Sequence, residues 1–249
     1  MSYRIQATEK TPALILYLLD ISRSMTLPMG GRRRLDIALD SLTASLKQMV
    51  FRSTKGGRLS PRYRVALIAY SDAVYDLLGG IRPIDEVARK GIPDLVPQRL
   101  TETAEAFAYA EKLLLAELPG LDGCPAPLVC HITDGTPTGA DPEPVVRRIM
   151  DMTVPDGAVL VENIFISEHL LAEPVGDVRS WGGIQDDTPF LDETAVRLRR
   201  MSSRIPESYL ELLHDSGYPL AAGSYMMLPG SSAELVGLGF QMSSATPVR

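Results

Sequence analysis

Three oxygen-bearing side chains stand at alternate positions directly after the first long apolar run of the sequence. The run covers residues 13–19, and the carboxyl group of Asp20 and the hydroxyl groups of Ser22 and Ser24 follow it. A carboxylate with two hydroxyls is a set of hard oxygen ligands, which Mg²⁺ and similar cations prefer. Asp and Ser are also common in turns and helix caps. The triplet therefore indicates either a cation site or a turn that caps the following helix.

Two distant stretches supply further oxygen atoms of the same kind. Thr101 stands at the start of an amphipathic segment, and Asp134 ends a second apolar run. Thr is also a common N-cap, so Thr101 could begin a helix instead of binding a cation, and Thr103 is its rival as a ligand. These stretches shift the interpretation towards a cation site assembled from three separate segments of the chain.

Asp-x-Ser-x-Ser, then Thr, then Asp at the end of a later strand resembles the metal-ion-dependent adhesion site of von Willebrand factor A (vWA) domains. The resemblance covers about residues 12–166 and weakens beyond them. It implies a divalent cation, Mg²⁺ in the first place with Mn²⁺ or Ca²⁺ as alternatives. The family places its ligand at the first Thr of a Thr-x-Thr sequence, which favours Thr101. The implied metal ligands are Asp20, Ser22, Ser24, Thr101 and Asp134.

The same resemblance implies a protein-interaction module and not an enzyme. In this family one coordination position of the metal stays open, and an Asp or Glu carboxylate of a partner protein fills it. The ligand types fit this use, because three neutral hydroxyls and two carboxylates leave a divalent ion attractive to a further carboxylate. We therefore expect a partner protein that offers Asp or Glu, and no catalytic residues.

Two other functions stay open at this point. Asp20 could be the nucleophile of a Mg²⁺-dependent phosphatase-like hydrolase. Such enzymes use a second carboxylate two residues further on, where this chain has Ser22, and the sequence contains no phosphate-binding Gly-rich loop or nucleophile-elbow motif. The chain could also be a scaffold that holds no metal.

The composition describes an ordinary globular chain. Its 249 residues are 45% hydrophobic, and a net charge of −6 argues against non-specific nucleic-acid binding. No apolar signal region opens the sequence and no apolar stretch has the length of a membrane span. Cys130 stands in a predicted buried strand, so we expect reduced cysteines and a cytoplasmic protein. Residues 132–138 look like those of bacterial stand-alone vWA domains, a subgroup that includes relatives of tellurite-resistance proteins.

The elements that must position these side chains alternate between apolar strands and amphipathic helices. This alternation predicts an α/β, Rossmann-like fold, doubly wound, with a mostly parallel central sheet, one short antiparallel edge strand and helices on both faces. A single domain is expected over residues 1–249, with a long loop at 168–190 and a C-terminal extension from about 203. The expected strands are 13–19, 64–70, 73–78 (the edge strand), 128–133, 158–166 and 217–229. The expected helices are 34–53, 102–118, 142–152, 191–202, 206–215 and 233–241.

A first loop, residues 26–34, follows the Asp-x-Ser-x-Ser triplet directly. It carries three consecutive arginines, Arg32, Arg33 and Arg34. They either lie in solvent or attract an acidic partner towards the cation.

A second loop, residues 168–190, leaves the carboxyl end of a strand, the edge where open α/β sheets bind ligands. Its Trp181 is either an apolar anchor for a partner or packs inwards as part of a lid on the core. Asp186 and Asp187 could bind a metal, but a solvated turn is the simpler interpretation. His131 is expected to be a core histidine with satisfied hydrogen bonds and not a ligand.

Overall fold

In the computed structural model, which describes residues 3–168 and 170–245, a seven-stranded sheet forms the centre of the molecule. Its strand order is β13-β12-β9-β1-β6-β7, with β8 also paired to β6. The parallel strands are β1 (Ala13–Asp20), β6 (Tyr63–Tyr70), β9 (Leu128–Thr133), β12 (Leu160–Phe165) and β13 (Met227–Pro229). Two short strands, β7 (Val74–Asp76) and β8 (Arg82–Pro83), run antiparallel to β6. The predicted α/β class with a mostly parallel sheet is confirmed, and β8 adds a second antiparallel strand.

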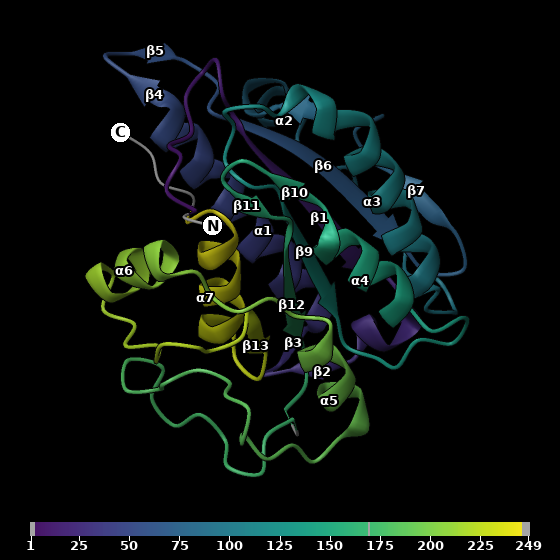
Figure 1. Ribbon diagram of the computed structural model, residues 1–249. Helices are drawn as coiled ribbons and strands as arrows, with labels where there is room; N and C mark the ends of the chain where they lie inside the picture. Colours follow the sequence, from purple (N-terminus) through teal and green to yellow (C-terminus); the bar gives the residue numbers. More distant parts are fainter. Residues whose placement is uncertain (1–2, 169, 246–249) are drawn as a thin grey trace.

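Helices cover both faces of the sheet, so β1 is buried along its whole length. Alternate β1 residues enter two hydrophobic clusters: Ile15, Tyr17 and Leu19 face one, and Leu14, Leu16 and Leu18 face the other. The first cluster is covered by α1 (Arg34–Ser53), α2 (Ile84–Lys90), α6 (Glu207–Asp215) and α7 (Ala233–Ser243). The second is covered by α3 (Thr103–Glu117), α4 (Glu143–Asp151) and α5 (Glu193–Arg200), as Figure 1 shows for α3 and α4.

Short hairpins and 3₁₀ turns lie between these elements. The hairpins are β2–β3 (Pro28–Met29 and Arg32–Arg33), β4–β5 (Thr54–Lys55 and Arg58–Leu59) and β10–β11 (Thr153–Val154 and Gly157–Ala158). The 3₁₀ turns are η1 (Arg23–Thr26) and η2 (Leu118–Gly120). Gly30 and Gly31 connect β2 to β3 with φ of 58° and 82°, the left-handed conformation that a two-residue hairpin turn requires. This hairpin places Arg34 at the first position of α1.

The C-terminal part of the chain completes the sheet. β13 is shorter than the predicted strand at 217–229, and it pairs in parallel with β12 at the sheet edge. α7 packs on α1, and the ring of its Phe240 lies 5.8 Å from the ring of Tyr17 on β1. Among the described residues, none of the helices has the length and apolar character needed to cross a membrane.

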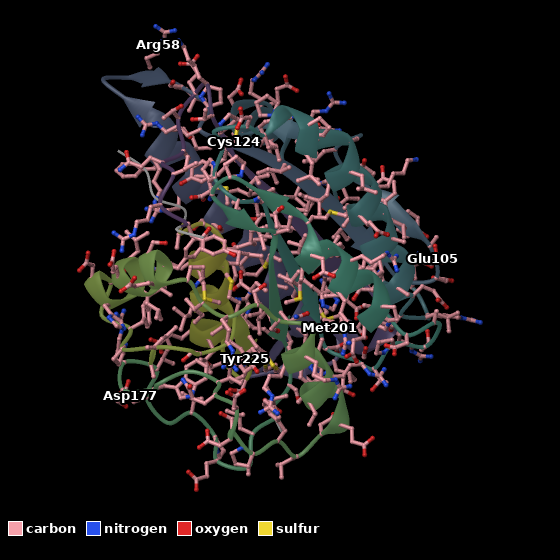
Figure 2. All side chains as sticks on the ribbon, in the orientation of Figure 1. Arg58, Glu105, Cys124, Asp177, Met201 and Tyr225 are labelled. Carbon is pink, nitrogen blue, oxygen red and sulfur yellow. The ribbon has the colours of Figure 1, made fainter. Side chains whose placement is uncertain are left out.

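Side chains are either buried in the core or directed towards the surface. Cys124 and Met201 are buried, whereas Arg58, Glu105 and Asp177 point outwards at the periphery (Figure 2). Both Cys124 and Cys130 are buried free thiols.

Candidate functional site

Asp20 and Thr133 end two neighbouring parallel strands. The register pairs Leu19 of β1 with Ile132 of β9, one residue before each end. The next side chains therefore meet at the carboxyl edge of the sheet, where Thr133 donates from Oγ1 to Oδ2 of Asp20 at 2.7 Å. The sequence motif does not include Thr133, although its position just before Asp134 at a strand end is a signal for it.

Asp20 is fully buried and held in one orientation. Its Oδ1 accepts the backbone N–H of Ser22 at 2.7 Å, so Asp20 does form the predicted turn. Burial raises the pKa of Asp20 to about 6; hydrogen bonds from Thr133 and Ser22 oppose the rise, and the nearby Asp134 adds to it. A buried carboxylate of this kind gains from any positive charge brought to the site.

Ser22 and Ser24 connect Asp20 to Asp134, and the backbone N–H of Ser22 makes the link to Asp20. Ser22 precedes η1, but its side chain makes no capping hydrogen bond, so the capping alternative is not observed for this residue. Instead Oγ of Ser22 lies 3.0 Å from Oγ of Ser24, and Ser24 donates to Oδ1 of Asp134 at 2.6 Å. Four of the five predicted residues therefore form one continuous hydrogen-bonded chain.

Thr101 is hydrogen-bonded to the loop that follows Asp134. α3 begins at Thr103 with Glu102 as its N-cap residue, so Thr101 does not cap the helix. Its backbone N–H donates to Oγ1 of Thr138 at 3.0 Å, and its carbonyl accepts the N–H of Thr138 at 3.1 Å. Thr101 is buried, and within the described residues its hydroxyl makes no hydrogen bond to the other predicted ligands.

The three arginines divide into two that face solvent and one that faces the site. Arg32 and Arg33 are more than half exposed and pair with acidic residues of α1. The Arg34 side chain is only 17% exposed, and its Nη1 lies 2.7 Å from Oδ2 of Asp134, whose side chain is fully buried. Neither predicted alternative, a solvated run or a run directed at a partner, describes Arg34, because its guanidinium is an internal part of the site.

His131 is a satisfied core histidine, as predicted. Its Nε2 lies 2.6 Å from the Tyr70 hydroxyl and its Nδ1 lies 2.7 Å from Oδ1 of Asn163. Because Nδ2 of Asn163 donates to Ser202 and to the Met201 carbonyl, its Oδ1 accepts, so His131 donates from Nδ1 and accepts at Nε2. Burial lowers the pKa of His131 to about 4, which keeps the ring neutral.

The far end of the segment between β12 and α5 leads to a contact beside the site. The hydroxyl of Thr194, near the start of α5, lies 2.9 Å from that of Thr136 in the loop after Asp134. Trp181 is half-buried against both hydrophobic clusters, which favours the inward-packing alternative. Asp186 pairs with Arg204 at 2.7 and 2.8 Å, at the surface.

A cation at this edge would depend on hydroxyl oxygens. In the parts of the chain that the structure describes, no group of three or more His, Cys, Asp or Glu side chains could hold a metal. Two carboxylates supplemented by Ser and Thr therefore remain the available ligand set.

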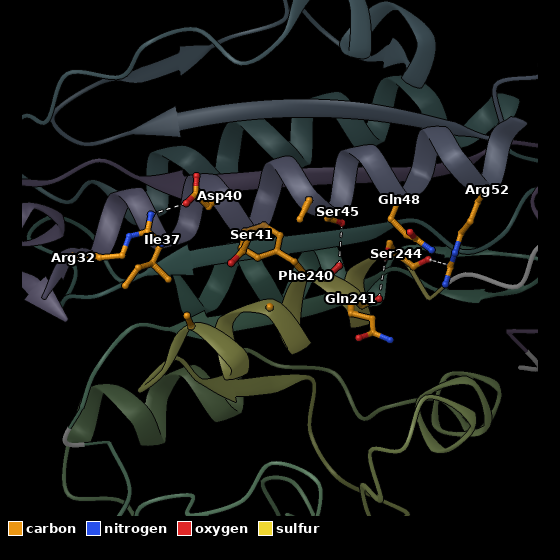
Figure 3. A pocket seen from close by; sticks show the side chains of 13 residues that line it. Arg32, Ile37, Asp40, Ser41, Ser45, Gln48, Arg52, Phe240, Gln241 and Ser244 are labelled. Carbon is orange, nitrogen blue, oxygen red and sulfur yellow. Dashed lines mark hydrogen bonds and ion pairs between the residues drawn. The ribbon is translucent and has the colours of Figure 1, made fainter. Parts of the chain in front are cut away.

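A groove elsewhere on the surface lies apart from these residues. It runs between α1 and α7, has a volume of about 510 Å³ and is bordered by Ser41, Gln48, Phe240 and Gln241 (Figure 3). None of the predicted ligands lines it.

Comparisons with known proteins show that this chain is similar to some of them in fold only. No known protein-family model matches the sequence, and a search of curated proteins returns no match. Among solved structures, the PilB minor pilin from Streptococcus sanguinis matches with a TM-score of 0.57 and 11% identity over 95% of this chain and 62% of that one. Proximal thread matrix protein 1 from the mussel byssus matches with a TM-score of 0.50 and 16% identity, over 94% and 49% of the two chains.

A vWF domain is also among these structural neighbours. The vWF domain of the type V pili tip protein Mfa5 from Porphyromonas gingivalis matches with a TM-score of 0.40 and 19% identity, over 51% of this chain and 39% of that one. The chain thus spans less than two thirds of the length of each of these structures. The two matches that cover nearly the whole chain support the α/β architecture.

Proposed function

We propose that this chain is a metal-dependent protein-interaction module of the vWA type. A divalent cation, Mg²⁺ in the first place, is held by Asp20, Ser22, Ser24, Thr101 and Asp134. The observation that carries the proposal is the hydrogen-bonded chain that links four of these residues at the carboxyl edge of a parallel sheet. The partner is a protein that offers an Asp or Glu carboxylate.

The residues present fit a hard divalent cation. The predicted ligands offer oxygen atoms only, the donor type that Mg²⁺ and Mn²⁺ prefer. Asp20 is buried with a raised pKa, and a cation would favour its ionised form. The Asp134 side chain already lies against a positive charge, that of Arg34. Bound metal would supply an electrophilic centre for a carboxylate, while the two serines orient the carboxylates of Asp20 and Asp134.

The hydrolase alternative has weaker support. Both carboxyl oxygens of Asp20 accept hydrogen bonds, and the side chain is fully buried, which is unfavourable for a nucleophile that must reach a substrate. Such hydrolases have a second carboxylate two residues after the nucleophile, and this chain has Ser22 at that position. We therefore propose a binding function without catalysis, in a bacterial, cytoplasmic protein related to the tellurite-resistance-like subgroup.

Calorimetric titration with Mg²⁺ and Mn²⁺ tests the site. We expect Asp20→Ala and Asp134→Ala each to abolish cation binding, and Asp186→Ala, which removes a surface carboxylate, to leave it unchanged. Circular dichroism checks that each variant is folded. Equal affinity in the wild type and both site variants would contradict the ligand assignment.

Partner capture and a hydrolysis assay separate the two functions. Immobilised protein should retain a partner from a bacterial lysate with Mg²⁺ and release it with chelator, and the Asp20→Ala protein should retain none. The purified protein should not hydrolyse p-nitrophenyl phosphate. Turnover that is lost in Asp20→Asn would favour the hydrolase instead.

A further inference from the structure

Arg34 occupies a position that its two neighbours do not share. As the first residue of α1 it extends its guanidinium towards the carboxyl edge of the sheet, and Nη1 binds Oδ2 of Asp134 at 2.7 Å. Oδ1 of the same carboxylate accepts from Ser24. Arg33, one residue earlier, is 57% exposed and pairs with Asp36 on the surface. Position 34 therefore places a permanent positive charge among the proposed metal ligands.

The contact between Arg34 and Asp134 is incomplete as an ion pair. A single guanidinium nitrogen is bonded to the carboxylate, whereas an optimised arginine–carboxylate pair uses two parallel bonds. Nε of Arg34 is buried and has no hydrogen-bond partner among the described residues, an arrangement that costs stability. The Arg34 guanidinium is therefore held to Asp134 by one bond and is not fixed in a two-bond pair.

A count of formal charges shows how the Arg34 guanidinium affects metal binding. Ionised Asp20 and Asp134 with Arg34 give the site a net charge of −1, so a divalent ion brings it to +1. One partner carboxylate then brings it to zero. Without the arginine, the two carboxylates would balance the formal charge of the metal, and an incoming carboxylate would be attracted less strongly.

We propose that Arg34 is a built-in counter-charge of this site, which weakens the binding of a divalent cation alone and favours the joint binding of cation and partner carboxylate. In the absence of a partner, the guanidinium weakens metal binding in either of two positions. If it stays beside the metal it repels it, and if it withdraws from Asp134 the ion pair between them is lost. By thermodynamic linkage, a carboxylate that strengthens metal binding is itself bound more tightly when metal is present. The inference rests on the proposed function and adds the residue that makes cation and partner depend on each other.

Titration with Mn²⁺ alone tests the first half of this proposal. Arg34→Met removes the charge while keeping an unbranched side chain, and it should bind Mn²⁺ about tenfold more tightly than the wild type. Arg33→Met is the matched control, because it removes a neighbouring arginine that faces solvent, and it should change little. Unchanged or weaker Mn²⁺ binding in Arg34→Met would overturn the proposal.

Acetate serves as the carboxylate probe for the second half. Mn²⁺ affinity is measured in sodium acetate and in sodium chloride of equal ionic strength, with correction for the metal–acetate complex in solution. Acetate should strengthen Mn²⁺ binding in the wild type and in Arg33→Met, and clearly less in Arg34→Met. An equal effect of acetate in all three proteins would refute the joint binding.

Thermal unfolding keeps the test informative if Arg34→Met folds poorly. Without metal this variant should melt below the wild type, because Asp134 is left buried without a counter-charge, and Mn²⁺ should raise its melting temperature by more than that of the wild type. An equal or smaller Mn²⁺ shift contradicts the inference. If neither protein binds Mn²⁺, the proposed function fails with it; if both bind through Asp134 with equal affinity, the inference alone fails.

Discussion

At the scale of single residues, burial moves the pKa values of Asp20 and His131 in opposite directions. It raises the pKa of the carboxyl to about 6 and lowers that of the imidazole to about 4, because it disfavours the charged form of each. The two groups therefore give the stability of the fold opposite dependences on pH.

The first prediction concerns the pH dependence of stability. Unfolded His131 takes up a proton below its ordinary pKa of 6.5, whereas folded His131 does so only near 4, so its contribution is complete above 6.5 and is lost as the pH falls to 4. The loss amounts to about 3 kcal/mol. Asp20, with its raised pKa, acts in the opposite sense and stabilises the fold as the pH falls from about 6 towards 4.

Urea unfolding of the wild type and His131→Gln, in chelator between pH 4 and pH 7, separates the two groups. The difference in unfolding free energy between the proteins should shrink by about 3 kcal/mol from pH 7 to pH 4. A difference that is independent of pH would contradict the prediction, because it would show that the pKa of His131 is the same in the folded and the unfolded chain.

The sequence predicts that residues directly after strand ends lie close together in the site. Asp20, Ser22, Ser24 and Asp134 come directly after apolar runs, and the carboxyl ends of parallel strands share an edge. The direction of the Arg34 side chain could not be predicted, since it depends on where the β2–β3 hairpin starts α1. Metal binding by these residues stays a prediction.

At the scale of elements, Asp156 fastens the N-terminal segment to the β10–β11 hairpin. Its Oδ1 accepts the backbone N–H groups of Arg4 and Ile5 at 2.9 and 3.0 Å, and its Oδ2 accepts that of Ala126 at 3.0 Å. Asp156 is only 3% exposed. One carboxylate therefore satisfies backbone donors of two segments distant in sequence.

Asp156→Ala should lower the unfolding free energy by about 3 kcal/mol, because it leaves three backbone N–H groups without their acceptor. Asp156→Asn keeps one acceptor oxygen and should lose less, and the exposed Asp151→Ala is a neutral control. Chemical denaturation measures these differences. Faster hydrogen exchange at Arg4 and Ile5 in Asp156→Ala alone would locate the effect, and equal stability of all variants would contradict it.

The long loop between β12 and α5 is the second element with a testable role. Since Trp181 lies half-buried against both hydrophobic clusters, Trp181→Ala should lower the unfolding free energy by about 2 kcal/mol, and Trp181→Phe by less. The measurement is thermal or urea unfolding, alongside partner capture. Unchanged stability with lost partner capture would restore the interpretation of Trp181 as a partner anchor.

At the scale of the whole molecule, long periodic segments could be predicted and short ones could not. β1, β6, β9, β12 and α1 carry enough apolar or amphipathic residues to indicate their type and approximate limits. The two-residue strands of the three hairpins, and β8, are too short to show any periodicity. β13 was placed correctly at the end of a longer predicted strand, but only the backbone pairing with β12 fixes its true length.

The last prediction links the site to the stability of the whole chain. A ligand that binds the folded state and not the unfolded one stabilises the fold by about 2.7 kcal/mol when present at about 100 times its dissociation constant. For a chain of this size such a gain raises the melting temperature by about 5–10 °C. Mg²⁺ should therefore shift the melting temperature of the wild type and of Asp186→Ala, and NaCl of equal ionic strength should not. Asp20→Ala should show no shift with Mg²⁺, since it lacks the carboxylate that ends β1; the same rise in that variant would place the cation elsewhere on the molecule.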